Sequence, residues 1–101
     1  MLEPMEIELR DYRIHEGQME AWIAGWKSHV VPLREAAGFR VIGAWVDPQH
    51  DRFIWLLGYA GDTGFRAADE RYYASGERTA LDPDPAALID ESTKTMVQAV
   101  L

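Results

Sequence analysis

The segment from residue 39 to residue 59 limits most strongly what this chain can fold into. Two runs rich in β-branched and aromatic residues, Phe39–Val46 and Arg52–Tyr59, flank the turn sequence Asp47–Asp51, which predicts a β-hairpin. Both runs carry large apolar residues at odd and at even positions, whereas a hairpin with one wet face alternates apolar and polar residues. We therefore expect both faces to be covered, one by helices of the same chain and the other by a second copy or by a closed pocket.

A period of two residues assigns the hairpin side chains to faces. In the second strand, one face carries Phe53, Trp55, Leu57 and Tyr59, and the other carries Ile54 and Leu56. In the first strand, the same period sets Phe39, Val41 and Trp45 against Ile42, Ala44 and Val46.

Length and composition set broad limits on function. The 101 residues are enough for a single domain, residues 1–101, with a small core. The net charge of −7 disfavours nucleic acid and anionic membranes as partners, because both are bound through lysine and arginine. The lack of cysteine excludes disulfides and thiolate chemistry. We see no signal peptide and no apolar run of about 20 residues, so we expect a soluble cytoplasmic domain.

The first part of the chain predicts a strand and a long helix. Alternation predicts a strand over Glu6–Ile14, followed by a turn at His15–Gly17. Apolar residues at a spacing of three and four then predict a helix over about Gln18–Ala37, with an apolar stripe of Met19, Trp22, Ile23, Trp26, Val30, Leu33 and Ala37. Pro32 lacks the backbone donor that a helix interior needs, so we expect a kink or a break near Lys27–Ser28.

The last part predicts two more helical segments and a final strand. A helix over about Phe65–Ser75 is expected to begin at Asp62 or Thr63 as N-cap. Residues 76–79 suggest a loop. Asp84 and Pro85 predict a short helix to about Asp90. Residues 94–101 favour a strand, with a helix as the competing interpretation. The order is that of an α+β, ferredoxin-like βαββα(α)β sandwich.

Several residues in this order resemble the NIPSNAP domain, a branch of the dimeric α+β barrel superfamily. The most specific piece is the strand sequence Glu8-Leu9-Arg10-x-Tyr12, and the pattern continues through Gly38-Phe39, Gly43-x-Trp45 and Arg52-Phe-Ile-Trp-Leu-x-Gly-Tyr59. The resemblance covers residues 6–101, although His15-Glu16-Gly17 departs from the usual basic-Pro-Gly turn. It implies a homodimer whose two sheets pack face to face. It implies no agreed catalytic residue, and neighbouring barrel families include cofactor-free monooxygenases, haem-degrading enzymes and isomerases.

Glu8, Arg10 and Tyr12 share one face of the first predicted strand. One interpretation places them around a ligand in the barrel lumen, as an anionic, a cationic and a phenolic group. The other is a buried ion-pair network, since buried charges must be paired. Both interpretations stay open.

The aromatic side chains Trp45, Trp55, Tyr59 and Tyr72 allow a similar choice between core packing and the walls of a ligand pocket. Trp45 is the preferred pocket member among the hairpin aromatics because it lies near a strand end. Either Tyr72 or its neighbour Tyr73 must face inwards, where it could roof a pocket.

The histidines show no metal-ligand spacing and the glycines no nucleotide-binding spacing. We therefore expect neither a metal nor an organic cofactor. His29 flanks the apolar stripe of the long helix, and it could serve as a general base or haem ligand or remain a half-exposed helix residue.

Two functional hypotheses follow. The first is a homodimeric module that binds a small apolar or aromatic ligand or mediates an interaction. The alternative is a cofactor-independent monooxygenase or isomerase acting on an electron-rich aromatic. In that scheme Arg10 stabilises a developing phenolate or enolate, Tyr12 or Tyr72 relays a proton, and Trp45 holds the ring.

Overall fold

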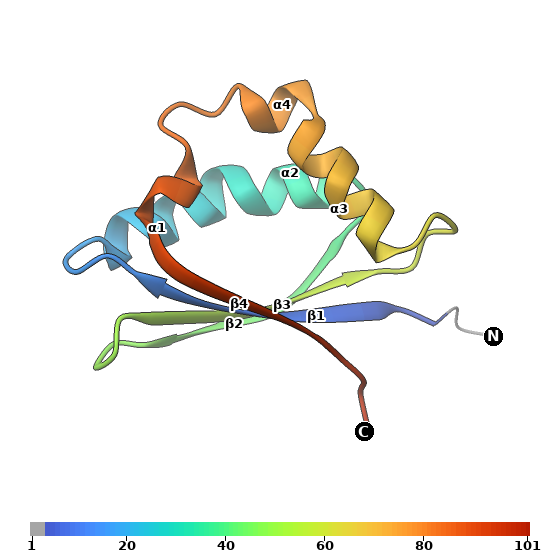
Figure 1. Ribbon diagram of the computed structural model, residues 1–101, viewed down its shortest axis with the longest axis horizontal. Coiled ribbons are helices and arrows are strands. Elements are labelled where there is room, and N and C mark those ends of the chain that lie inside the picture. Colours follow the sequence, from blue (N-terminus) through green and yellow to red (C-terminus); the bar gives the residue numbers. More distant parts are fainter. Residues whose placement is uncertain (1–3) are drawn as a thin grey trace.

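The computed structural model describes residues 4–101 and shows a four-stranded antiparallel sheet with helices on one face (Figure 1). The strands are β1 (Glu6–Ile14), β2 (Arg40–Asp47), β3 (Arg52–Tyr59) and β4 (Ile89–Val97), in the spatial order β2-β3-β1-β4. This order is that of the ferredoxin-like fold. The predicted α+β class is confirmed, as are the two hairpin strands and the strand at the start.

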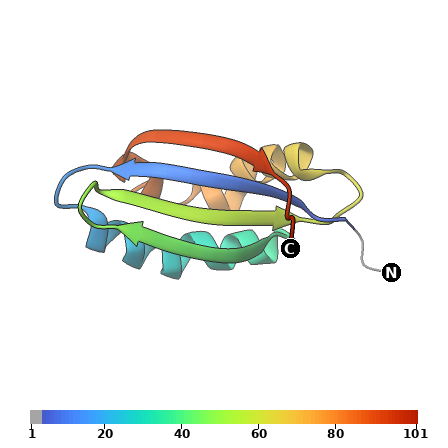
Figure 2. The same cartoon turned by 90° about the horizontal axis from the view of Figure 1, so that it is seen from below.

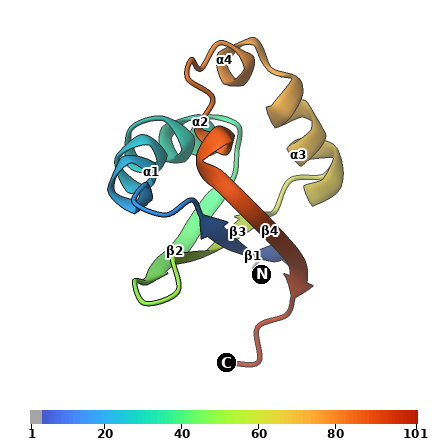
Figure 3. The ribbon, with the colours of Figure 1, turned by 60° about the vertical axis from the view of Figure 1, so that its left-hand side comes forward.

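The helical segments form two rows above the sheet. One row consists of α1 (Met19–Gly25), the π-helical segment η1 (Trp26–Val30) and α2 (Val31–Ala36). The other consists of α3 (Phe65–Ala74) and the single turn α4 (Gly76–Thr79). The 3₁₀ turn η2 (Pro85–Leu88) contacts α1 and leads into β4 (Figure 3). Among residues 4–101, no helix combines the length and the apolar character that a bilayer crossing needs.

The interruption predicted near Lys27–Ser28 is the π-helical segment η1. Its last bond runs from the Val31 N–H to the Trp26 carbonyl, five residues back, and Pro32 has no N–H to restore the α-helical pattern. The extra residue turns the following helix face by about 100°. As a result Arg34 is fully buried. Of the predicted stripe members beyond Val30, Leu33 is partly buried and Ala37 is exposed. The predicted stripe therefore holds through Leu33, which packs against the core, and fails at Ala37.

A β-bulge in β2 corrects the predicted faces of the first hairpin strand. Val41 pairs with Leu57 and Ala44 pairs with Trp55, so the register shifts between Val41 and Gly43. Because a bulge inserts one residue into one strand, Val41 and Ala44 share the helix-covered face. Trp45 lies on the opposite face, and its predicted position beside Val41 was wrong.

Three predicted element boundaries also change. The N-cap of α3 is Gly64 at φ 84°, not Asp62 or Thr63. Residues 76–79 form the helical turn α4, whose Arg78 N–H donates to the Ser75 hydroxyl. The final strand is confirmed over the helical alternative, but it begins at Ile89 instead of Lys94. Asp84 caps η2 as predicted, and η2 ends at Leu88.

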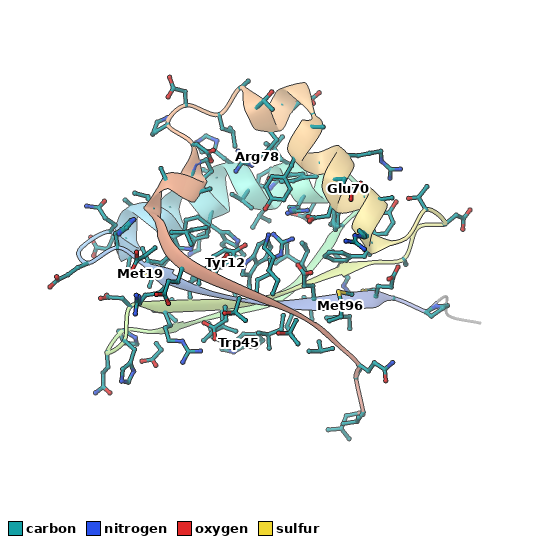
Figure 4. All side chains as sticks on the ribbon, in the orientation of Figure 1. Tyr12, Met19, Trp45, Glu70, Arg78 and Met96 are labelled. Atoms are coloured by element: carbon teal, nitrogen blue, oxygen red, sulfur yellow. The ribbon has the colours of Figure 1, made fainter. Side chains whose placement is uncertain are left out.

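The two faces of the sheet are covered unequally. The covered face and the helices share a core that includes Tyr12, Ile14, Trp22, Trp26, Phe53, Trp55, Leu57, Phe65 and Tyr72. Figure 2 looks onto the other face, where the strands lie in front of the helices and the C-terminal segment after β4 passes in front of one end of the sheet. We call this surface the open face and define it by Leu9, Ile42, Trp45, Ile54 and Leu56. Figure 4 shows Trp45 pointing away from the helices and Tyr12 lying between sheet and helices.

Candidate functional site

Arg10 lies at the centre of the covered face and is fully buried. Strand pairing places it between Trp55 of β3 and Lys94 of β4. Its guanidinium donates from Nε to Glu8 Oε1 at 2.7 Å and from Nη2 to Asp69 Oδ1 at 2.9 Å. Two carboxylates on a buried arginine form charge-assisted hydrogen bonds that offset its desolvation.

A second buried arginine, Arg34, reaches the same carboxylate from α2. It is 1% exposed, and its Nη1 donates to Asp69 Oδ1 at 2.7 Å. Its guanidinium carbon lies 3.7 Å from the centre of the Tyr72 ring, a stacking contact that arginine makes readily. Asp69 therefore joins β1 and α2 through α3. The π-helical segment makes this contact available, because it turns Arg34 towards the sheet.

Tyrosine hydroxyls complete the charged cluster. Arg10 Nη1 donates to the Tyr73 hydroxyl at 3.1 Å and to the Tyr12 hydroxyl at 3.3 Å. Burial lowers the pKa of Arg10, but Tyr12, Tyr73 and Asp69 outweigh that effect and raise it overall. Arg10 is thus a permanent cation at the centre of the site.

The three tyrosines of the cluster differ in acidity. Burial raises the pKa of Tyr12 and that of Tyr72, because a phenolate loses hydration there. Burial acts on Tyr73 in the same direction, but the charges of Arg10, Arg34 and Lys94 prevail and lower the pKa of its phenol. Tyr73 is 40% exposed although its hydroxyl reaches buried Arg10. It is the one phenol of the three suited to exchanging a proton between solvent and the interior.

A cavity of about 30 Å³ lies against these groups. Its walls combine the charged cluster with aromatic residues and the turn η2, and they include Arg10, Tyr12, Trp22, Arg34, Trp55, Tyr72, Tyr73, Arg78 and Pro85. Four buried polar atoms of these walls have no hydrogen-bond partner among residues 4–101, namely Trp22 Nε1, Arg34 Nε, Trp55 Nε1 and Tyr72 Oη. Buried polar groups normally have partners, so these four atoms can form hydrogen bonds with a water or a ligand in this space.

Five of the eight sequence-predicted site residues meet at this cluster: Glu8, Arg10, Tyr12, Trp55 and Tyr72. Three do not. Trp45 is 56% exposed on the open face. Tyr59 packs on Phe39, and its hydroxyl accepts from Arg71 Nη2 at 3.3 Å. His29 is exposed and lines a surface groove beside α1.

Sequence reasoning missed Arg34, Asp69 and Arg78 and left the inward residue of the Tyr72–Tyr73 pair open. Asp69, Tyr72 and Tyr73 are spaced as i, i+3 and i+4 on one helix, and this spacing places them close together. That signal was present in the sequence. Arg34 gave no such signal, because a regular helix would have buried Leu33 instead.

The residues of the cluster offer cations and phenols, and they do not suit a metal ion. Within the described range 4–101, no group of three or more His, Asp or Glu side chains is placed to hold one. The cluster can stabilise negative charge on a bound oxygen through Arg10 and Arg34 and can transfer a proton at Tyr73.

This architecture defines a ferredoxin-like α+β protein with a buried arginine–tyrosine cluster between the sheet and its helices. Residues 7–100 match the family model described as NIPSNAP. The chain therefore belongs to the NIPSNAP family, as the sequence resemblance implied.

Solved structures of low sequence identity share the fold. A NIPSNAP family protein of Agrobacterium tumefaciens is 21% identical with a TM-score of 0.82, over 94% of this chain and 92% of that chain. An uncharacterized NIPSNAP domain protein of Burkholderia xenovorans is 17% identical with a TM-score of 0.79, over 93% of each chain. A candidate antibiotic biosynthesis monooxygenase of Bacteroides thetaiotaomicron is 16% identical with a TM-score of 0.71, over 96% of this chain and 90% of that chain. The comparison with curated proteins gave no match.

Proposed function

We propose that this chain works as a homodimer in which each protomer binds a small molecule whose oxygen acceptor enters the cavity between the sheet and its helices. This proposal rests on the unpaired buried donors around one cavity, which include Arg34 Nε beside the Arg10 cluster. A bound molecule with an oxygen acceptor would give these donors a partner. Aromatic walls with a few convergent polar groups are the usual composition of a small-molecule site.

The homodimer part of the proposal rests on the open face. Trp45 is 56% and Ile42 is 40% exposed there, and both flank partly buried Ile54 and Leu56. Contiguous apolar patches of this kind mark interaction sites. A two-fold axis would pack two such faces together, because each presents the same surface to the other. The family resemblance implies the same face-to-face arrangement.

Replacing Leu56 with Lys tests this part. A charge at the centre of the open face should convert the protein to a monomer in size-exclusion chromatography. Ala74→Lys, on the exposed side of α3, is the matched control and should leave the dimer intact. An Leu56→Lys protein that elutes with the wild type would contradict the proposed interface.

Tryptophan fluorescence, with thermal shift in parallel, tests the ligand site. Two of the four tryptophans, Trp22 and Trp55, line the cavity, so a bound flat phenol or quinone should quench them saturably. It should also raise the melting temperature, since it binds the folded state. The Trp45→Phe variant removes the exposed open-face indole and should retain the quenching. Quenching that disappears in this variant, or no response to any compound of the panel, would count against the cavity.

A cofactor-free enzyme is the second candidate, and the lowered pKa of Tyr73 favours it. Arg10 would stabilise a phenolate or enolate, and Tyr73 in its phenolate form would take the proton that the substrate releases and become a neutral phenol. The candidate monooxygenase of similar fold supports testing oxygen as co-substrate. Oxygen uptake with the compound that binds should fall at least tenfold, a loss of about 1.4 kcal/mol in transition-state stabilisation, in Tyr73→Phe. Unchanged uptake in that variant would remove Tyr73 from the mechanism.

If no compound of the panel binds, we expect the protein to be an interaction module whose cavity holds water. One water needs about 30 Å³ of space, which equals the cavity volume of about 30 Å³.

A cytoplasmic location is part of the proposal, and it is consistent with the lack of cysteine.

A further inference from the structure

An apolar groove lies on the outer surface next to the cavity. It runs between the α1–η1 segment and the connection from α4 to β4, and its volume is about 580 Å³. The helix contributes Ala21, Trp22 and Gly25, and the connection contributes Leu81, Pro83 and Leu88. His29, the histidine singled out in the sequence, also lines this groove. The groove is thus mainly apolar, and the polar residues that line it are Gln18, His29, Asp82 and Asp84.

The volumes decide where the body of a ligand can lie. Small-molecule sites usually enclose about 300 to 1,000 Å³. The cavity of about 30 Å³ is far too small for an organic ligand, whereas the groove of about 580 Å³ is large enough. A ligand that reaches the buried donors must therefore place most of its volume in the groove.

Only one layer of side chains separates the two spaces. Trp22 of α1 and Pro85 of η2 line both the cavity and the groove. The turn η2 has no fully buried residue, but its Leu88 packs against the core as a partly buried side chain. Joining the two spaces would require a displacement of this turn that loses part of that contact. Tyr12 and Tyr73 also line the cavity.

An acidic ligand can exchange with a carboxylate at the boundary, where three arginines and three carboxylates balance in charge. Arg10, Arg34 and Arg78 are buried in the cavity wall, against the carboxylates of Glu8 and Asp69. The third carboxylate, Asp84, pairs with Arg78 at 2.9 Å while its own side chain is 56% exposed. Asp84 lines the groove, so a ligand carboxylate arriving through the groove can replace it on Arg78 or occupy the unpaired donor of Arg34.

We propose that the groove and the cavity form one site for an amphipathic organic acid, with its carboxylate at Arg34 and Arg78 and its apolar body in the groove. This inference rests on the proposed function, because it names the ligand class of the same cavity. The overall charge of −7 repels acids in general, so the buried arginines supply the selectivity.

Isothermal titration calorimetry with three compounds of one shape tests the ligand class. The probes are 2-naphthoate, 2-naphthamide and 2-naphthylmethylammonium. A charge-assisted hydrogen bond is about twice as strong as a neutral one, so naphthoate should bind about tenfold more tightly than the amide, and the ammonium compound should bind most weakly. Equal affinities for the three would overturn the assignment of an acid.

Two variants test the two halves of the site. Gly25→Leu fills the groove, and the fold should tolerate it, because a Cβ at Gly25 meets no atom within 4 Å and leucine favours helix over glycine. It should weaken naphthoate at least tenfold, whereas the control Ala24→Leu, one residue away on the exposed side of α1, should not. Asp84→Asn retains an N-cap and frees Arg78, so it should tighten naphthoate about threefold or more without changing the amide.

The outcomes separate this inference from the proposed function. If no probe binds the wild type, both are overturned. If benzoate binds as tightly as naphthoate and Gly25→Leu changes neither, the cavity site stands and the groove plays no part. If Asp84→Asn leaves naphthoate binding unchanged, the carboxylate does not lie at Arg78.

Discussion

The two faces of the sheet divide polar and apolar side chains in a way that reverses the usual arrangement. The covered face carries Arg10 at its centre, fully buried between Trp55 and Lys94. The open face carries Trp45 and Ile54 with no helix above them. Charges are normally exposed and large apolar groups buried. The exceptions are informative, because a buried polar cluster points to a site and an exposed apolar patch points to an interface.

Strand β1 shows this reversal within six residues. Glu8, Arg10 and Tyr12 face the helices, whereas Ile7 and Leu9 pair across the open face with Gly58 and Leu56. The strand is therefore not an amphipathic strand with its polar side in water. Glu8, Arg10 and Tyr12 serve the interior of the protomer, and Ile7 and Leu9 lie on the open face. Farther along the strand, Asp11 and Arg13 form ion pairs at the surface.

The largest expected effect comes from truncating one tryptophan on each face. In the monomeric Leu56→Lys background, Trp55→Ala should lower the free energy of unfolding by about 4 kcal/mol, because it empties the core. Trp45→Ala in the same background should cost less than about 1 kcal/mol, because its indole is already in water. Urea denaturation measures both. Similar losses for the two variants would mean that the faces do not differ as described.

A smaller effect is expected at the start of α3. The Phe65 N–H donates to Glu6 Oε1 at 2.8 Å, so a carboxylate of β1 caps a helix on the covered side. Glu6→Ala should lower the melting temperature with a loss of about 1 kcal/mol. Asp62→Ala, at the position that the sequence suggests as the cap, should leave stability unchanged. A larger loss of stability in Asp62→Ala than in Glu6→Ala would instead support Asp62 as the cap of α3.

The smallest expected effect is a shift in one tyrosine titration. Phenolate absorbance should show one tyrosine with a pKa below 10 in the wild type, and Tyr73→Phe should lack it. Because the pKa is lower in the folded state, the ionised phenol adds stability that is fully present above pH 10, the unfolded value, and is lost as pH falls through the folded pKa. An unchanged titration in Tyr73→Phe would refute the influence of Arg10, Arg34 and Lys94.

The fold could largely be predicted from the sequence, because strand alternation, helix spacing and turn residues are local. Three features could not. The bulge beside Ile42 and the π-helical turn at Trp26–Val30 each add one residue to a regular element, which changes the face of everything that follows. The cap from Glu6 to Phe65 joins residues far apart in the chain, where no local pattern indicates it.

The same limits explain the candidate site. Glu8, Arg10 and Tyr12 were found because one straight strand carries them. Arg34 was hidden by the π-helical turn, and Trp45 was misplaced by the bulge. The buried network that the sequence offered as one interpretation is present at Arg10. The unpaired Nε of Arg34 beside it is the basis for the proposed pocket.

The most direct test of the reversed sheet is the mass of the wild-type protein in solution. Sedimentation equilibrium at micromolar concentration should give twice the protomer mass of 11.5 kDa, because we propose that a second copy covers the open face. A mass of 11.5 kDa throughout that range would contradict the account, since the apolar face would then stay in water and the reversal of the two faces would need another explanation.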